Sequence, residues 1–316
     1  MMQFWLQLPE IFRLDVVKKL DYKSRCCLRK VSKSERTLVD SCPVFLDYVT
    51  VEPRVGNQIY FSIEESKSEA LLNDKAYGTD DVLQDFRLIF KNPKSRIKQL
   101  TVDHYNFQRQ PDAINELFAS LITSNLKMKI EKLSFHYGEM SEVSFLNFMK
   151  SLDSKFLNTL RVRKFPVKSL PVLKELVATE HWRSLKDIRI QEKIPNSIEI
   201  FSHCDTFRVT FHSLSSLSAW KCVQNFRSTP RPPRSFFEIF LMQEFSIQDF
   251  LAHFDVAIEN RPIQKYVSNL VLHTQHFKLN WSNDLLLIVW VSKRCVKGVI
   301  CRKEFLLEDF EENDDF

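Results

Sequence analysis

The side chains best suited to binding a metal ion lie near the end of the sequence. His273 and His276 form an H-x-x-H pair, and Cys295 and Cys301 follow them. A structural zinc site needs several nitrogen or sulfur ligands at characteristic spacings, and these four residues match none of the common zinc patterns. We therefore interpret them as surface histidines beside buried thiols, and we expect neither a bound metal nor another cofactor.

Catalytic nucleophiles and phosphate-binding loops are not indicated either. The 8 histidines are dispersed along the sequence, and none occupies a recognisable triad setting with a serine or cysteine. The chain has 4 glycines, where ordinary usage in a chain of this length would give about 22. Because they are scattered, they form no dinucleotide fingerprint, phosphate loop or nucleophile elbow. We predict that the chain is not an enzyme.

The 7 cysteines are expected to be reduced thiols. Their number is odd, and residues 1–8 have neither the basic region nor the small-residue cleavage site of a signal peptide. The adjacent Cys26 and Cys27 cannot both face one site on a helix, so one of them is expected to be buried. The most apolar run, Leu285 to Val291, is too short to cross a bilayer. These features predict a cytoplasmic or nuclear protein that does not enter a membrane.

Charge is unevenly distributed. The sequence has 45 basic and 40 acidic residues, a net charge of +5, and six of the acidic residues form a tail at residues 307–316. Setting those six aside raises the net charge of the remainder to +11, but its basic residues are dispersed. This dispersal favours a solvated surface over a phosphate-binding track, so we expect no nucleic-acid partner. A nucleic-acid-associated protein stays open as an alternative hypothesis.

The segment Arg227 to Arg234, RSTPRPPR, concentrates three prolines and three arginines. Such a segment can be a polyproline ligand or a basic contact loop. We favour the simpler interpretation, an extended connection between two structural elements.

The elements that would position these residues begin with a helical N-terminal segment. Apolar residues recur at helical spacing after Leu8-Pro9, and polar residues 21–24 interrupt the pattern. A second helical stretch is predicted over residues 27–42, ending before Pro43. The segment is compact enough to form a small helical domain.

A hairpin and a further helix are predicted next. Residues 45–51 and 59–63 have β-forming patterns on either side of Gly56-Asn57, which is a turn signal. Asp80-Asp81 then begins a helix whose apolar face extends to Phe90, with two carboxylates at its positive end.

From residue 97 onward a short apolar pattern repeats seven times, at an average interval of about 28 residues. Apolar residues occupy the first, fourth and sixth positions of each copy, which indicates a short buried strand. Helical patterns fill most of the intervals, so the chain alternates strand and helix in the manner of an irregular leucine-rich-repeat-like α/β solenoid. An ordinary α/β domain with uneven connections is the alternative. The copies are Ile97/Leu100/Val102, Ile130/Leu133/Phe135, Leu157/Leu160/Val162, Leu185/Ile188/Ile190, Cys204/Phe207/Val209, Phe236/Ile239/Leu241 and Val267/Leu270/Leu272.

The N-terminal segment resembles an F-box. Leu8-Pro9 opens it, Leu20-Asp21 follows twelve residues later, and Leu28 to Ser32 reads Leu-Arg-Lys-Val-Ser, close to the Leu-x-x-Val-Cys of the family. Arg25 stands where leucine is common, and Glu35-Arg36 stands where an aromatic residue is usual. Followed by a phenylalanine-rich repeating body, this segment makes the whole chain similar to the nematode group of F-box proteins with an FTH-type associated domain.

This resemblance implies the substrate-receptor subunit of an SCF-type (cullin-RING) ubiquitin ligase. The F-box would dock on a Skp-type adaptor and through it on cullin, and the repeat domain would hold a target protein of unknown identity. The implied domains are a helical F-box (1–44), a connecting hairpin and helix (45–95), a recognition domain (96–306) and an acidic tail (307–316). Arg25 and Glu35-Arg36 suggest an alternative, a protein-interaction scaffold with a drifted F-box, that is, one that has diverged and no longer recruits a ligase. The implied adaptor-binding residues are Leu8, Pro9, Ile11, Val16, Leu20, Leu28 and Val31.

Overall fold

The computed structural model describes residues 5, 7–54, 58–64, 72–103, 112–136, 141–164, 167–194, 197–258 and 271–303. The chain is a mixed α/β protein in which helices at the N-terminus precede open, mostly parallel sheet structure with intervening helices, as the sequence predicts. It divides into two compact units. The first unit comprises Met1–Val167 and Lys174–Ser184, and the second comprises Lys168–Leu173 and Leu185–Phe316.

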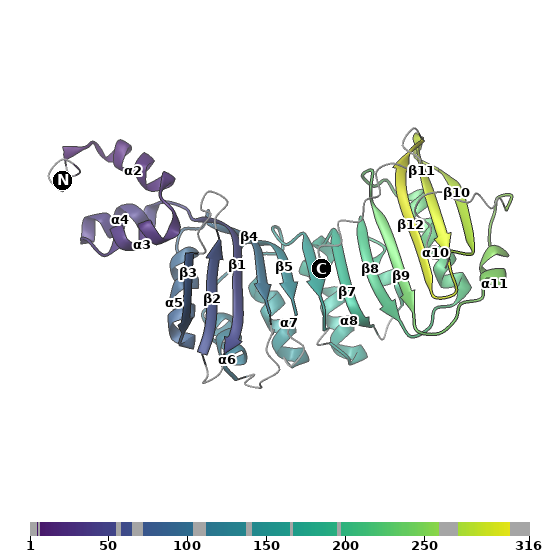
Figure 1. Cartoon of the computed structure of the whole chain (residues 1–316), viewed down its shortest axis with the longest axis horizontal. Helices are drawn as coiled ribbons and strands as arrows, with labels where there is room; N and C mark the ends of the chain where they lie inside the picture. Colours follow the sequence, from purple (N-terminus) through teal and green to yellow (C-terminus); the bar gives the residue numbers. More distant parts are fainter. Residues whose placement is uncertain are drawn as a thin grey trace. The chain divides into compact units, whose positions relative to one another are not determined.

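From α2 onward, the described part of the first unit has three short helices and then continues into strands. Its sheet has the order β6-β5-β4-β1-β2-β3, in which β1, β4, β5 and β6 are parallel and β1, β2 and β3 are antiparallel neighbours. In Figure 1 the helices α6 and α7 lie behind these strands. The elements are α2 (Glu10–Lys19), α3 (Tyr22–Arg29), α4 (Lys33–Ser41), β1 (Phe45–Arg54), β2 (Gln58–Glu64), β3 (Leu72–Tyr77), α5 (Thr79–Ile89), β4 (Arg96–Val102), α6 (Asp112–Thr123), β5 (Ile130–Phe135), α7 (Glu142–Ser151), β6 (Thr159–Val162) and α9 (Glu180–Ser184), with α8 (Leu170–Ala178) divided between the units.

Local capping explains why the N-terminal segment forms three helices. The Asp21 side chain accepts a hydrogen bond from the backbone N–H of Ser24 at 2.6 Å, which starts α3 immediately after α2. Ser32 caps α4 in the same way by accepting from the N–H of Glu35 at 3.1 Å. The prediction of one helical stretch over residues 27–42 is therefore wrong, because the Ser32 cap begins a new helix after a break at residues 30–32.

The second unit contains the remaining strands. Its sheet has the order β10-β11-β12-β9-β8-β7, in which β7, β8 and β9 are parallel and the pairs β9–β12, β12–β11 and β11–β10 are antiparallel. In Figure 1 the helix α10 lies behind these strands. The elements are β7 (Asp187–Lys193), the 3-10 helix η1 (Ile198–Phe201), β8 (Thr206–Phe211), α10 (Ser216–Ser228), β9 (Phe236–Leu241), α11 (Ile247–Leu251), β10 (His273–Leu279), β11 (Ser282–Val291) and β12 (Cys295–Arg302).

The repeated apolar pattern marks real strands in six of its seven copies. The copies that begin at residues 97 to 236 fall on or beside β4 to β9, and the fourth and sixth residues of each are buried. The seventh copy differs: Val267 and Leu270 lie outside the described residues, and Leu272 is exposed just before β10. The next strands that the structure describes, β10 to β12, are antiparallel, and the repeat does not predict them.

Two expectations about single side chains are wrong. Cys26 is partly buried and Cys27 is exposed, so neither is a core cysteine. His273 is buried on β10, where its ring packs near Phe254 with 6.2 Å between ring centres. An alternating strand places every second side chain toward the helix layer, and this periodicity takes His273 inward.

Gly298 on β12 is required by close packing. It lies directly opposite Phe237 of β9, and a Cβ atom at this position would overlap the Phe237 ring. We therefore expect Gly298→Ala to lower the free energy of unfolding of the second unit by about 1–3 kcal/mol. Hydrogen exchange of the β9 and β12 amides measures the change. Adding Phe237→Leu to Gly298→Ala should recover part of the lost free energy of unfolding, because the smaller side chain makes room for the new Cβ. If the destabilisation of the double variant instead equals the sum of the two single destabilisations, this account is contradicted.

Candidate docking surface on the N-terminal helices

The three N-terminal helices enclose a small core. Val17, Leu38, Val39 and Cys42 are buried together, and Trp5, Leu14 and Leu28 pack against them while remaining partly exposed. The core therefore uses one face of α2, the face that carries Leu14 and Val17. The opposite face of α2 is directed to solvent.

That outward face of α2 is also apolar. Ile11 is 65% exposed and Phe12 is 58% exposed, with Val16 at 40%, and Leu8 precedes the helix at 40%. Val31, at the turn between α3 and α4, is 49% exposed. Among the residues that the structure describes, 15 large apolar side chains are exposed, and these five fall within residues 8–31. Concentrated exposed apolar area of this kind marks interaction surfaces.

The predicted adaptor-binding residues divide into two groups in the structure. Leu8, Pro9, Ile11, Val16 and Val31 are exposed, and Pro9 is the N-cap residue immediately before α2. Leu20 and Leu28 are partly buried, and Leu28 packs against the small core.

The sequence reasoning missed Phe12. It lies four residues after Leu8 and four before Val16, so helical spacing would have placed it on the same outward face. We call the exposed set Leu8, Pro9, Ile11, Phe12, Val16 and Val31 the apolar docking surface.

The Arg25 side chain links the end of α2 to the chain segment after α4 through hydrogen bonds. Its Nε donates to the carbonyl of Leu20 at 3.0 Å, one Nη donates to Pro43 at 2.7 Å, and the other donates to Lys18 at 3.0 Å. The last carbonyls of a helix have no partner within the helix, and the guanidinium supplies one. A single buried side chain on α3 thereby ties the end of α2 to the chain segment after α4.

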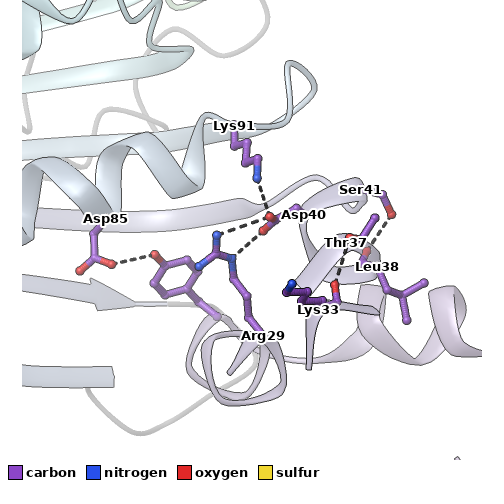
Figure 2. Close-up of polar contacts among 9 residues, drawn as sticks. Arg29, Lys33, Thr37, Leu38, Asp40, Ser41, Asp85 and Lys91 are labelled. Carbon is purple, nitrogen blue, oxygen red and sulfur yellow. Dashed lines mark hydrogen bonds and ion pairs between the residues drawn. The ribbon is translucent and has the colours of Figure 1, made fainter. Parts of the chain in front are cut away.

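An ion-pair cluster joins the same helices to the strand-forming part of the first unit (Figure 2). Asp40 on α4 lies 2.7 Å from Nε of Arg29 on α3 and 2.6 Å from Nζ of Lys91, which follows α5. Burial by itself raises the pKa of Asp40, but the hydrogen bonds from Arg29 and Lys91 outweigh burial and lower the pKa below its ordinary value. Asp40 is therefore held as a carboxylate between the two cations.

A second contact lies beside this cluster. The hydroxyl of Tyr22 on α3 donates to Asp85 on α5 at 3.2 Å (Figure 2). Burial is the main cause that raises the pKa of Tyr22 and also that of Asp85. Asn92 adds a hydrogen bond from its side-chain amide to the carbonyl of Ser41 at 2.7 Å. The docking surface is thus carried on helices fixed to α5 and the residues after it.

The other motifs singled out from the sequence form no second site in the described ranges. No group of three or more His, Cys, Asp or Glu side chains is suitably placed for a metal ion there. The RSTPRPPR segment begins with the last two residues of α10, Arg227 and Ser228, and its remainder connects α10 to β9. Its Arg231 is buried and makes structural hydrogen bonds. No helix within those ranges is sufficiently long and apolar to cross a membrane.

Comparison with known families identifies the chain. The F-box domain model matches residues 5–47, the segment that forms α2 to α4 and includes Trp5. The FTH domain model matches residues 112–257. No curated protein matches the chain significantly.

The chain is therefore an F-box protein. More particularly, it belongs to the F-box proteins that carry a C-terminal FTH domain, which confirms the resemblance seen in the sequence. At a general level, an F-box indicates a substrate adaptor of SCF-type ubiquitin ligases. F-box proteins are generally non-catalytic, and their F-boxes typically bind Skp-type adaptors.

Proposed function

We propose that this protein is the substrate-receptor subunit of an SCF-type (cullin-RING) ubiquitin ligase. The apolar docking surface binds the Skp-type adaptor, which connects the chain to cullin, and the strand–helix units act as a leucine-rich-repeat-like frame that holds the target protein. Ubiquitin transfer then belongs to other subunits, and this chain contributes proximity and orientation. We keep residues 1–44, 45–95, 96–306 and 307–316 as the proposed functional divisions.

The observation that carries this proposal is the second apolar face of α2. A ten-residue helix needs one apolar face to join its own core, and Leu14 and Val17 provide it. Ile11, Phe12 and Val16 on the outward side do not serve that core. Apolar side chains of this size at an interface centre are the kind that dominate binding energy.

The alternative of a drifted F-box rests on Arg25 and Glu35-Arg36. Arg25 makes three hydrogen bonds to backbone carbonyls, and Glu35 is buried, with its backbone N–H in the Ser32 cap. Arg25 and Glu35 therefore have roles in the fold of the domain, whereas Arg36 is exposed. Their departure from the family pattern does not favour loss of the docking surface.

Charged substitutions on α2 test the proposal. We expect Ile11→Asp and Phe12→Asp each to weaken binding of the full chain to a Skp-type adaptor at least about tenfold, because each buries a carboxylate against an apolar partner. Surface-immobilised adaptor and purified variants give the dissociation constants.

Val143→Asp is the matched control, because Val143 on α7 is 59% exposed but lies outside residues 8–31. It should leave adaptor binding unchanged. Unaltered binding by the Ile11→Asp/Phe12→Asp double variant would reject the proposed surface, and recovery of a different partner without the adaptor would favour the scaffold.

A further inference from the structure

The edge of the first unit's sheet at which the parallel strands begin is rich in cations. Three successive connections lead from a helix to a strand at this edge: residues 90–95 before β4, 124–129 before β5 and 152–158 before β6. Each of them carries at least one exposed lysine. Because parallel strands begin at the same edge of a sheet, the three connections lie side by side. We call the following set the basic edge: Lys94, Arg96, Lys127, Lys129 and Lys155.

The positive charge of the basic edge is not neutralised within the described ranges. None of its five cations forms an ion pair there. Nζ of Lys127 donates to the carbonyl of Lys150 at 2.7 Å, and Nζ of Lys129 donates to the carbonyl of Pro93. An ammonium group has three donors, so a neutral carbonyl fixes its position while its charge and its other donors stay available.

The carboxylates around the basic edge are fewer than its cations. Asp47 of β1 and Glu131 of β5 lie on either side of Lys98, an exposed lysine of β4. Asp153 lies on the connection before β6. Counting Lys98 with the basic edge gives six cations against these three carboxylates, so the excess is three positive charges.

Two phenylalanine rings flank the central cations of the basic edge. Phe45 of β1 is 53% exposed and pairs with Arg96, whose guanidinium carbon lies 5.1 Å from the centre of the ring. Nζ of Lys129 lies 4.9 Å from the ring centre of Phe156, which is partly exposed. Arg96 and Lys129 are neighbours, because the residues that follow them pair in register. The order across the edge is therefore ring, cation, cation, ring.

The spacing of this row suits an extended polypeptide. Neighbouring strands lie about 4.8 Å apart, so three such intervals separate the two rings by about 14 Å. In an extended chain, residues i and i+4 are about 13–14 Å apart and point to the same side, with residue i+2 midway between them. Such a chain can place two apolar side chains against the rings and an acidic side chain at the two cations. Single-stranded nucleic acid fits less well, because it uses rings as stacking platforms and a cation already lies over each of these rings.

We propose that the basic edge, with Phe45 and Phe156, binds an extended segment of the target protein in which apolar residues stand two positions before and two positions after an acidic residue. The inference rests on the proposed substrate-receptor function and gives the target a chemical class. The lysines of the three connections would attract further acidic residues of the segment. Because Asn92 in the first connection donates to the carbonyl of Ser41, the bound segment would lie beside the helices that carry the docking surface.

A short fluorescent peptide of the proposed pattern tests the inference. It has a central glutamate, a phenylalanine two residues before it, another two residues after it, and aspartates at the other positions. Anisotropy with the full chain measures its affinity. We expect glutamine in place of the peptide's central glutamate to weaken binding at least about threefold, because it removes the charge that meets the two cations. Lys94→Glu with Arg96→Glu, a change at two exposed positions, should weaken binding about tenfold.

A control variant and two further probes show whether the effect belongs to this edge. Lys186→Glu with Lys278→Glu makes the same change of charge at two exposed positions of the second unit and should leave the peptide affinity unchanged. Lack of peptide binding, equal binding of the glutamine peptide, or equal binding by the Lys94→Glu/Arg96→Glu variant would each overturn the proposal. Tighter binding of single-stranded oligouridine would overturn it in favour of a nucleic-acid partner.

Adaptor binding separates this inference from the proposed F-box function. Lys94→Glu/Arg96→Glu should keep the wild-type adaptor affinity, which shows that the first unit is folded. Lys155→Glu, on another connection, is a second variant that should weaken peptide binding about threefold, and an unchanged affinity would contradict the proposal. Ile11→Asp should lose the adaptor and keep the peptide, so failure of the F-box function is read separately.

Discussion

Arg231→Met is expected to lower the free energy of unfolding of the second unit by about 2–4 kcal/mol, because it leaves several oxygen acceptors around a buried side chain without their charged donor. The Arg231 side chain is 5% exposed, and its guanidinium donates to the carbonyls of Cys204 at 3.1 Å and Ser202 at 2.8 Å. It also donates to the carbonyl and side-chain oxygens of Asn225, at 3.1 and 2.6 Å. Methionine keeps most of the apolar volume but leaves these oxygens without their donors.

Hydrogen exchange of α10 and β8 amides is the appropriate measurement, because a chain of two units need not unfold in one step. Arg234→Met is the control, since Arg234 is an exposed residue of the same segment and its side-chain replacement should change stability by less than about 0.5 kcal/mol. The free energy of unfolding of Arg231→Lys should lie between those of wild type and Arg231→Met, because a lysine offers fewer donors in a less suitable geometry. Equal exchange rates in Arg231→Met and wild type would show that the network does not stabilise the unit.

Arg25→Leu is expected to destabilise the three-helix segment by about 2–4 kcal/mol and to weaken adaptor binding. The change removes three charge-assisted hydrogen bonds and leaves the carbonyls of Lys18, Leu20 and Pro43 without that donor. Leucine is the residue common at this position in the family, so the substitution also restores the usual pattern. The drifted F-box hypothesis predicts that restoring the leucine leaves adaptor binding unchanged or strengthens it.

Two measurements distinguish these outcomes. Hydrogen exchange over α2 to α4 reports the local stability, and adaptor affinity reports the function. Arg36→Leu is the matched control, because Arg36 is an exposed arginine of the same segment. Tighter adaptor binding by Arg25→Leu with unchanged exchange would contradict our account of Arg25.

Periodicity predicted most of the strands because each strand buries its own apolar residues against the helix layer. Leu100 and Val102 of β4, for example, are both buried. The helix α10 was not predicted, and its buried face mixes Trp220, Cys222 and Phe226 with polar neighbours. The antiparallel strands β10 to β12 were missed for another reason. Strand direction depends on pairing between distant segments, and residues 285–291 alone read only as an apolar run.

Part of the exposed apolar set on the N-terminal helices could be predicted in outline because the F-box pattern is local. Leu8, Ile11 and Val16 were identified from that pattern, and all three are exposed. Phe12 was missed because the pattern does not specify it. The role of Arg25 could not be read from the sequence, since it depends on three carbonyls that come together only when α2, α3 and the residue after α4 are packed.

The antiparallel strands that adjoin the parallel ones affect how such a chain can gain or lose residues during evolution. In the first unit β2 and β3 adjoin the parallel strands through β1, and in the second unit β12, β11 and β10 adjoin them through β9. Hairpins need only short connections, whereas each parallel strand requires a crossover of its own. Duplication or loss of a whole strand–helix pair therefore leaves the hairpins intact, while a fractional insertion breaks the register. Evolution can thus lengthen or shorten the parallel part of each sheet in discrete steps.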